Sequence, residues 1–528
     1  MELQTYQYAI ASLVILAVYR VYQYSKLFTR PKKFPPGPKP APFIGNVHQM
    51  PTSVPHLKFG EFASQFGAIT GLKVGCQNWI ILNTWQAVHD LIDKKSAIYS
   101  SRPSMPGVEI VAPNGISPVT NVYGDSWRSQ RKKLVEFLGG ERTDRMKPVQ
   151  DAESTQMIYD ILHQPGHLEE HVERAFGSAI LVTVFGTRER TIERTSWVQT
   201  FFDIEKRWTR VVEPTSAPPY GAFPWLKKLP IWMTPWVEWK KLALEVKRDQ
   251  RNFYYALFEG TKKRMTQGKA SNCFMAQCLR VQEKEGVSDD FLAYVGGVLI
   301  EGGAETSSST TMVFIMAMAA YPEVVAQVQE ELDRVCGRDK IPGRDDMSKL
   351  PYLRACMLEV LRWRPIVPLG VPHQTTKADV HEDFVIPDDT TVVINAYRIN
   401  HDETFYDSPS TFDPTRYLDN EYGSTFATNN PDAIRGRRVS YSFGAGRRVC
   451  PGQRFAENGL MMHFAKLAWA FDFIATGTLP VDTWDDWSEG LAFRPKDLKV
   501  DLRLRDEGRI KVMENAWAEA DTYLSQFE

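Results

Sequence analysis

The strongest chemical signal in the sequence is a ten-residue loop around one cysteine. The loop runs from Phe443 to Gly452 and reads FGAGRRVCPG, and a helical pattern follows it from about Gln453 to Trp469. Cys450 therefore precedes a helix N-terminus, where free backbone N–H groups and the helix dipole stabilise a thiolate. Gly446 and Gly452 permit a positive φ or a close backbone approach to a flat cofactor.

The side chains of this loop suit a metal-bound thiolate. Phe443 can shield the sulfur from water, and Arg448 can pair with a carboxylate. A thiolate in this setting can be the axial ligand of a haem iron, where it donates electron density that favours O–O cleavage. A buried, inert cysteine in a glycine-rich turn is the alternative. The other five cysteines lie far apart and form no C-x-x-C pair, which argues against a zinc or dithiol site.

A second chemical signal lies inside a long apolar segment that predicts a helix capped by Ser288 and ending at Ala320. Its middle reads Gly302-Gly303-Ala304-Glu305-Thr306. Gly302 and Thr306 share a helix face, so the missing side chain leaves a gap beside the hydroxyl. That hydroxyl can also bond the Gly302 carbonyl and open the helix locally. An acid and an alcohol beside a groove can relay protons to a small ligand, whereas close packing over small residues is the alternative.

An acidic and a basic residue form the third signal. Glu359 and Arg362 lie one turn apart on a helix predicted from Pro351 to just before Pro365. An exposed pair of this kind contributes only about 0.5 kcal/mol, but the apolar neighbours indicate a half-buried setting. Arg416 is a candidate third partner, and the sequence leaves that question open.

The elements that must position these groups are mostly helices with a minor β part. Helical patterns dominate from about residue 123 to Val212 and again from Trp236, with a proline-rich and aromatic break between them. Short strands are predicted over Ile69–Val74 and Trp79–Leu82, and a hairpin over Phe384–Ile386 and Thr391–Ile394. The fold class is therefore mainly α.

The N-terminus predicts a membrane anchor. The segment from Tyr6 to Tyr24 is 19 residues long and mostly apolar, close to the roughly 20 residues that a spanning helix needs. A signal peptide is the alternative, but Glu2 replaces its basic start and no small-residue cleavage site follows. Basic residues and five prolines come next. We therefore predict an anchor over residues 1–25 and a stiff hinge over 26–45, with the remaining chain in the cytoplasm.

Length and composition bound the rest of the chain. About 150 residues per domain would divide 528 residues into three or four domains. The motifs bracket a single site, however, so we predict one catalytic domain over 46–528. Hydrophobic residues are 43% and charged residues 24%, which excludes a disordered, fibrous or polytopic membrane protein. The net charge of −1 provides no global field for nucleic acid.

Together these segments resemble the cytochrome P-450 family of haem-thiolate monooxygenases, and the resemblance covers nearly the whole chain. The fixed positions of the family's F-x-x-G-x-R-x-C-x-G motif are Phe443, Gly446, Arg448, Cys450 and Gly452. Glu359, Arg362 and Arg416 match its E-x-x-R network. The oxygen-activation motif A-G-x-[DE]-T is matched by Gly303, Glu305 and Thr306, with Gly302 in place of alanine.

The resemblance implies a helical prism with a small β-rich lobe around haem b. It makes Cys450 the iron ligand, and it assigns Trp127, Arg131, His373 and Arg448 to the haem propionates. The implied reaction is a two-electron reduction of O2, with one oxygen entering the substrate and one leaving as water. Thr306 and Glu305 would deliver the protons.

The resemblance also implies partners and a location. No Gly-x-Gly-x-x-Gly fingerprint and no length for a flavin domain are found, so electrons would come from NADPH–cytochrome P-450 reductase, with cytochrome b5 as a further candidate partner. We expect docking near Arg131, Lys132, Lys133 and Arg447. Residues 1–45 resemble a microsomal anchor and hinge, which implies the endoplasmic reticulum membrane with the body facing the cytoplasm.

Finer details resemble filamentous-fungal members that act in secondary metabolism, in particular the segments from Ser96 to Pro103 and Val371 to His373. The regions expected to contact substrate are largely apolar or small, so a medium-sized hydrophobic molecule is expected. They are Val108–Val122, residues 302–306, Pro368–Val371 and the turn near Gly490-Leu491.

Two other functions remain open. A haem-thiolate isomerase or dehydratase would need no O2, and the Glu305-Thr306 pair argues against it. A non-enzymatic haem- or lipid-binding membrane protein would need no oxygen-activation residues.

Overall fold

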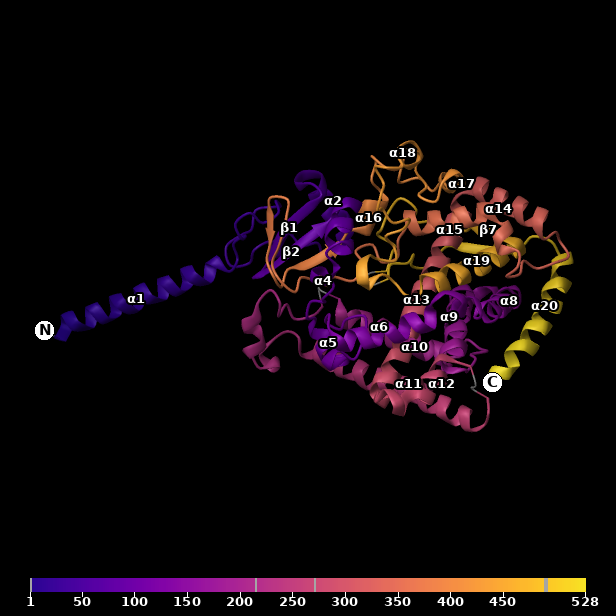
Figure 1. Ribbon diagram of the computed structural model, residues 1–528, viewed down its shortest axis with the longest axis horizontal. Helices are drawn as coiled ribbons and strands as arrows, with labels where there is room; N and C mark the ends of the chain where they lie inside the picture. Colours follow the sequence, from indigo (N-terminus) through magenta and orange to yellow (C-terminus); the bar gives the residue numbers. More distant parts are fainter. Residues whose placement is uncertain (1, 214–215, 270–271, 489–491) are drawn as a thin grey trace.

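The structure is a computed structural model that describes residues 2–213, 216–269, 272–488 and 492–528, and most of these residues are helical (Figure 1). The helices up to residue 266 are Glu2–Lys26 (α1), Pro55–Phe66 (α2), Trp85–Val88 (α3), Ser96–Tyr99 (α4), Pro106–Val111 (α5), Asp125–Leu138 (α6), Gly140–Asp144 (α7), Lys147–His163 (α8), Leu168–Phe185 (α9), Trp197–Val212 (α10) and Val237–Thr266 (α11). The later helices are Phe274–Glu285 (α12), Asp289–Ala320 (α13), Pro322–Val335 (α14), Pro351–Trp363 (α15), Ala396–Asn400 (α16), Arg416–Asp419 (α17), Thr425–Asn429 (α18), Gln453–Ala470 (α19) and Gly508–Leu524 (α20). The predicted mainly α class is confirmed.

The strands form one four-stranded sheet and two pairs within the described residues. Their bounds are Ile69–Val74 (β1), Gln77–Leu82 (β2), His373–Gln374 (β3), Asp379–His381 (β4), Phe384–Ile386 (β5), Thr391–Ile394 (β6), Phe471–Ala475 (β7) and Val500–Leu504 (β8). The large sheet has the order β1-β2-β6-β3, with β2 and β6 parallel and the other neighbours antiparallel. Figure 1 shows β1 and β2 at the end of the body from which α1 projects.

The predicted hairpin of β5 and β6 is wrong, although both strands exist with the predicted bounds. β5 pairs with β4, whereas β6 lies between β2 and β3. The intervening turn includes Asp389 at φ 58°, and the Thr375 hydroxyl donates to the Pro387 carbonyl at 2.9 Å. All four residues of β6 are buried. The chain therefore leaves one sheet and enters another, because β6 gains more burial between two neighbours than a two-stranded hairpin offers.

Helix α13 runs through the centre of the protein and divides its apolar core. Its N-terminal half packs with α9, α10, α11 and α12 in one hydrophobic cluster. Residues from Met312 to Ala319 belong to another cluster, together with α15 and α19. Ser288 caps the helix by accepting a hydrogen bond from the Phe291 N–H at 3.2 Å, as predicted. The Gly302–Thr306 stretch therefore lies between two apolar cores, which fix the helix on both sides.

The predicted Glu359–Arg362 pair is confirmed and is fully buried. Arg362 Nε and Nη2 donate to the two carboxylate oxygens of Glu359, each at 2.7 Å. Arg416 is the third partner, with its Nε 3.4 Å from Glu359 Oε1. Arg362 also donates to the carbonyls of Asn400 and Pro409 at 2.9 and 2.8 Å. The network therefore joins α15 to the irregular segment that leads toward the cysteine loop.

The N-terminal segment leaves the body as an extended helix. Figure 1 shows α1 projecting away from the remaining elements. The following proline-rich stretch lies against the large sheet, where the Gly71 N–H donates to the Pro36 carbonyl at 2.7 Å. Across the described residues, no single helix has the length and hydropathy of a membrane span; only α13 and α14 pass together, bent by 106°. The predicted membrane anchor is therefore not confirmed.

Candidate active site

The cysteine loop is held in shape by its own backbone. The Cys450 N–H donates to the Phe443 carbonyl at 2.8 Å. Gly446 has φ 60°, and a Cβ there would lie 2.6 Å from the Ile92 carbonyl oxygen. Only glycine suits both requirements. Gly452 behaves differently, because it caps α19 at φ −90° and a Cβ would lie an ordinary 3.8 Å from Cys450 Sγ. The predicted positive φ is thus confirmed at Gly446 and absent at Gly452, where a close backbone approach to a flat cofactor stays a prediction.

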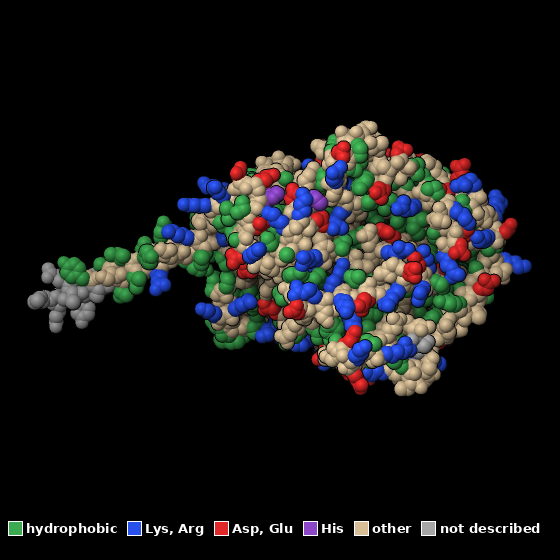
Figure 2. Space-filling model, viewed as in Figure 1, with side chains coloured by type: hydrophobic (Ala, Val, Ile, Leu, Met, Phe, Trp, Pro, Cys, Tyr) green, Lys and Arg blue, Asp and Glu red, His purple; other side chains and the backbone are tan. Residues whose placement is uncertain are grey.

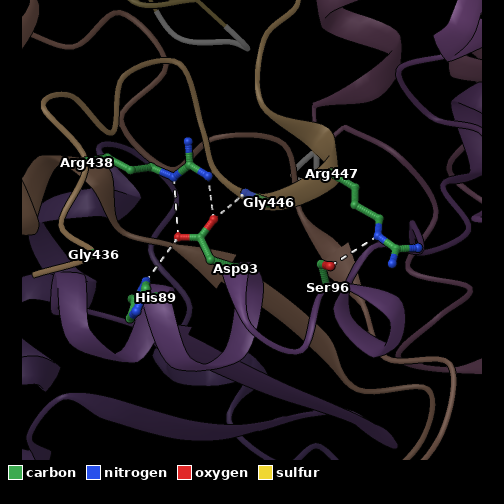
Figure 3. A pocket seen from close by; sticks show the side chains of 7 residues that line it. All are labelled: His89, Asp93, Ser96, Gly436, Arg438, Gly446 and Arg447. Atoms are coloured by element: carbon green, nitrogen blue, oxygen red, sulfur yellow. Dashed lines mark hydrogen bonds and ion pairs between the residues drawn. The ribbon is translucent and has the colours of Figure 1, made fainter.

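Asp93 anchors the same loop from a distant part of the chain (Figure 3). Asp93 ends a π-helical turn over His89–Asp93 that directly follows α3. Asp93 Oδ1 accepts from the Gly446 N–H at 2.8 Å, and Arg438 Nε donates to Oδ2 at 3.3 Å. Sequence reasoning missed Asp93, because it lies 353 positions from its partner in the loop and no short motif marks it.

The Cys450 thiol lies deep inside the protein, although its side chain has accessible surface area. Burial raises its pKa, while the N–H groups of Gly452 and Gln453 and the Arg131 guanidinium act in the opposite direction. The side chain nevertheless has exposed area, so that area faces the interior of the fold. The expected stabilisation of a thiolate by the helix N-terminus is therefore present, but burial outweighs it. A bound metal cation would provide the missing stabilisation, because coordinated thiols are deprotonated.

Three arginines gather near this thiol without an acidic partner. Arg448 donates through Nε, Nη1 and Nη2 to three carbonyls at 2.8, 3.1 and 2.6 Å. Arg131 donates to the Val449 carbonyl at 2.6 Å, and Arg102 donates to three carbonyls at 2.6 to 3.0 Å. Within the described part of the chain, none of the three forms an ion pair with a carboxylate. The expected Arg448–carboxylate pair is thus not made by the protein itself.

Two arginines of this cluster have lowered pKa values. The pKa of Arg448 falls to about 8 through burial and the charges of Arg102 and Arg131. Burial lowers the pKa of Arg102 to about 9. Trp127 stacks on Arg448, with its ring centroid 4.1 Å from the guanidinium carbon. His373 Nδ1 lies 2.8 Å from the Tyr99 carbonyl, which can only accept, so Nδ1 carries the proton. Burial and the neighbouring Arg102 hold the pKa of His373 well below its usual value.

The donor set therefore fits a haem. Buried cations without anions are costly, and the two propionates of a haem would supply the missing charge. Arg131 connects the two features, because its charge acts on the Cys450 thiol. Sequence reasoning missed Arg102 as a member of this set, although it lies inside the Ser96–Pro103 segment that resembles fungal relatives.

The central helix provides the second half of the site. Thr306 Oγ1 donates to the Gly302 carbonyl at 2.7 Å, as predicted, but the helix continues without the predicted local opening. A Cβ on Gly302 would meet nothing within 4 Å, whereas one on Gly303 would lie 2.4 Å from Ile180 Cδ1. Gly302 therefore borders open space beside Thr306, and Gly303 permits close packing against α9. The two glycines serve different purposes.

Glu305 is an acid suited to proton transfer near neutral pH. Burial raises its pKa to about 7, with Arg494 lowering and Glu173 raising it. A group with a pKa near the working pH can both take up and release a proton. Sequence reasoning missed Arg494, which donates to Glu173 at 2.8 Å. It follows the Gly490-Leu491 turn, which lies outside the described residues.

Two further acids lie close to Glu305. Glu205 on α10 is buried and Glu301 on α13 is half-buried, and each of their carboxyls has a raised pKa through burial and neighbouring acids. The sequence gives no sign of this meeting, because 96 positions separate Glu205 from Glu301. The helical spacing of Glu301 and Glu305 was the available clue.

Comparison with known proteins gives a consistent result. The family model described as Cytochrome P450 matches residues 35–502. The cytochrome P450 monooxygenase fogE of Aspergillus ruber is 32% identical, covering 96% of this chain and 94% of the relative. A cytochrome P450 monooxygenase of Arthrobotrys oligospora is 36% identical over 92% and 91%. The cytochrome P450 monooxygenase patI of Penicillium expansum is 32% identical over 94% of both chains.

The cysteine loop, the unpaired arginines and the acid–alcohol pair on α13 thus agree with an alignment that spans almost the whole chain. This protein belongs to the cytochrome P450 family.

Proposed function

We propose that the protein is a haem-thiolate monooxygenase that inserts one atom of O2 into a hydrophobic small molecule and releases the other as water. The observation that carries this proposal is the joint presence of the Cys450 loop, three arginines without a carboxylate partner among the described residues, and Thr306 beside open space. The haem, when bound, supplies the activation of O2. The chain supplies binding, orientation and proton transfer.

Each part of the site has a separate task. Arg102, Arg131 and Arg448 would hold the haem carboxylates, and Phe443 and Asp93 fix the loop whose thiol would be the ligand. Thr306 holds its hydroxyl proton on the Gly302 carbonyl, ready to reorient toward the open space. Glu305 restores a proton to that region, because its pKa lies near neutrality.

The direct test is the spectrum of the reduced, CO-treated protein. Cys450→Ala should abolish the thiolate-type band. Cys278→Ala is the matched control, since Cys278 is a buried cysteine in the apolar cluster around α12. A Cys450→Ala protein that retains the thiolate-type band would overturn the assignment.

We also propose NADPH–cytochrome P-450 reductase as the electron donor, with cytochrome b5 as an additional partner. Of the four basic residues expected at the contact, Lys132 and Arg447 are exposed. Lys133 pairs with Glu285, and Arg131 donates to the Val449 carbonyl. Lys132→Glu with Arg447→Glu should slow reduction by the flavoprotein. Unchanged reduction rates in that double variant would place the contact elsewhere.

Anchoring in the endoplasmic reticulum membrane, with the body in the cytoplasm, is a further part of this proposal. Apolar side chains on α1, including Leu13, Ile15 and Val18, are more than half exposed. Figure 2 shows hydrophobic side chains along α1 and basic ones near its junction with the body. We retain the division into 1–25, 26–45 and 46–528. Removing residues 1–25 should move the protein from the membrane pellet to the supernatant, and a chain that still pellets would contradict the anchor.

The biological setting proposed is fungal secondary metabolite biosynthesis. The relatives named above come from fungi, and the resemblance to secondary-metabolism members points the same way. Reconstitution with reductase, NADPH and a fungal metabolite extract should give a product heavier by one oxygen or lighter by two hydrogens. Turnover without O2 and NADPH would instead support the isomerase or dehydratase alternative.

A further inference from the structure

Three glutamates meet where α10, α11 and α13 pack together. Glu205 projects from α10, while Glu301 and Glu305 lie one turn apart on the same face of α13. Only 5% of Glu205 is exposed. The charges of Glu301 and Glu305 raise the pKa of its carboxyl, and α10 and α13 belong to one hydrophobic cluster. The three acids, Glu205 buried and the other two half-buried, therefore form one set on and beside the catalytic helix.

Their hydrogen bonding is unequal. Glu301 is tied to α11, because the Tyr254 hydroxyl and Gln250 Nε2 both donate to its Oε1. The carboxyls of Glu205 and Glu305 have no hydrogen-bond or ion-pair partner among the described residues. Arg494, whose charge acts on Glu305, already bonds Glu169 and Glu173. The buried Glu205 and the half-buried Glu305 thus keep unused hydrogen-bonding capacity.

Such groups are costly to the fold. A buried polar group without a partner pays its desolvation penalty in full, and native proteins contain few of them. An apolar residue at Glu205 would suit the surrounding cluster of Phe201, Phe202 and Ile204 better. The requirements of folding therefore do not explain why position 205 carries an acid. Metal binding does not explain the acid either, since no group of acidic, histidine or cysteine side chains in the described ranges is arranged to hold a metal ion.

The open space beside the acids indicates a role in ligand binding. Gly302 lies between Glu301 and Glu305 along α13, and a side chain added there would meet nothing within 4 Å. Thr306 borders the same face of the helix. A molecule bound in this space would place one end near the acids and another near the Thr306 hydroxyl.

We propose that Glu205 and Glu305 bind a hydrogen-bond-donating group of the substrate, a hydroxyl or an ammonium, and so orient its apolar part toward Thr306. This specificity site rests on the monooxygenase function proposed above and refines its substrate class. Glu301 already accepts hydrogen bonds from Tyr254 and Gln250, so Glu205 and Glu305 are the acceptors left for the substrate. The substrate is then an amphipathic molecule rather than a wholly hydrophobic one.

The test compares ligands of matched shape on the haem-loaded full chain. Calorimetric titrations use 2-naphthol, 2-methylnaphthalene and 2-naphthylmethylamine, which share one ring system and differ in the polar group. The wild type should bind 2-naphthol or the amine at least about tenfold more tightly than 2-methylnaphthalene. Preference for 2-naphthol identifies a hydroxyl as the recognised group, and preference for the amine identifies an ammonium.

Variants of Glu205 assign the preference to this site. Glu205→Leu should abolish it and leave binding of 2-methylnaphthalene within about twofold, while Glu205→Gln should retain part of it. Asp203→Asn, an exposed change on the same helix, is the control and should bind as the wild type does. Glu205→Leu should also raise the melting temperature of the ligand-free protein, whereas loss of a structural carboxyl would lower it.

The outcomes separate this inference from the proposed function. A wild type without preference, or a preference that survives in both Glu205 variants, overturns the inference. A normal thiolate-type CO band in that case leaves the monooxygenase proposal intact. Loss of that band in the wild type would instead overturn the proposed function.

Discussion

Two sets of buried glutamates in this protein have opposite surroundings. Glu359 is fully buried and is matched by Arg362 and Arg416, with a further hydrogen bond from the Asp413 N–H at 2.9 Å. Glu205 is almost as deeply buried and has no partner among the described residues. Burial alone therefore does not reveal what an acid does. The matched acid stabilises the fold, and the unmatched one is available to a ligand.

The arginines around the cysteine loop are an intermediate case, with hydrogen-bond partners but no opposite charge. Their N–H groups are satisfied by backbone carbonyls, yet their charges are not neutralised by the described residues. This arrangement suits a permanently bound dianion, because the geometry is fixed in advance while the charge remains available. Glu205 and Glu305 lack even hydrogen bonds among the described residues, which suits a ligand that binds reversibly.

The largest expected effect comes from breaking the matched pair. Arg362→Ala leaves Glu359 buried beside a single remaining cation, so the free energy of unfolding should fall by about 3–5 kcal/mol. Denaturant titration measures this loss, with Arg354→Ala on the exposed face of α15 as the control. A loss below about 1 kcal/mol would mean that the pair is as dispensable as a surface salt bridge.

The two acids on α13 should produce a smaller effect with a defined pH range. The pKa values of Glu301 and Glu305 are raised to about 7 in the folded protein, against about 4.3 in the unfolded chain. The folded state therefore holds protons that the unfolded state has lost, and stability falls as pH rises between about 4.3 and 7. Each unit of pKa shift corresponds to about 1.4 kcal/mol.

The measurement is the difference in unfolding free energy between the wild type and the Glu301→Gln, Glu305→Gln double variant across that range. The groups facing these acids are Glu205, Glu173, Arg494, Tyr254 and Gln250, and they are unchanged in the comparison. The difference should grow in favour of the double variant as pH rises. A difference independent of pH would mean that the two acids ionise normally.

The smallest expected effect tests the open space itself. Gly302→Ala should raise the free energy of unfolding by about 1 kcal/mol, because alanine favours the helix and its methyl group meets no atom within 4 Å. Gly303→Ala should lower it, since the methyl would lie 2.4 Å from Ile180 Cδ1. Thermal unfolding of both variants checks the contrast. Equal responses would show that the two glycines border similar surroundings.

Local patterns predicted much of the fold and part of the site. The bounds of α13, α15, β1, β5 and β6 follow from caps, prolines and periodicity, which act over a few residues. The pairing of β5 and β6 did not follow, because a strand's partner depends on competing neighbours elsewhere in the chain. The third partner of Glu359 was left open for the same reason, since Arg416 lies far along the sequence.

The sequence by itself determined the ligand loop, the acid–alcohol pair and the mainly helical class, because each rests on residue types at fixed short spacing. Only the tertiary structure decided which charges would be matched. Asp93 reaches Gly446, Arg102 joins Arg448, and Glu205 meets Glu301 through packing between segments distant in the chain. Electrostatic energies depend on separation in space and on burial, and neither quantity is written in the order of the residues.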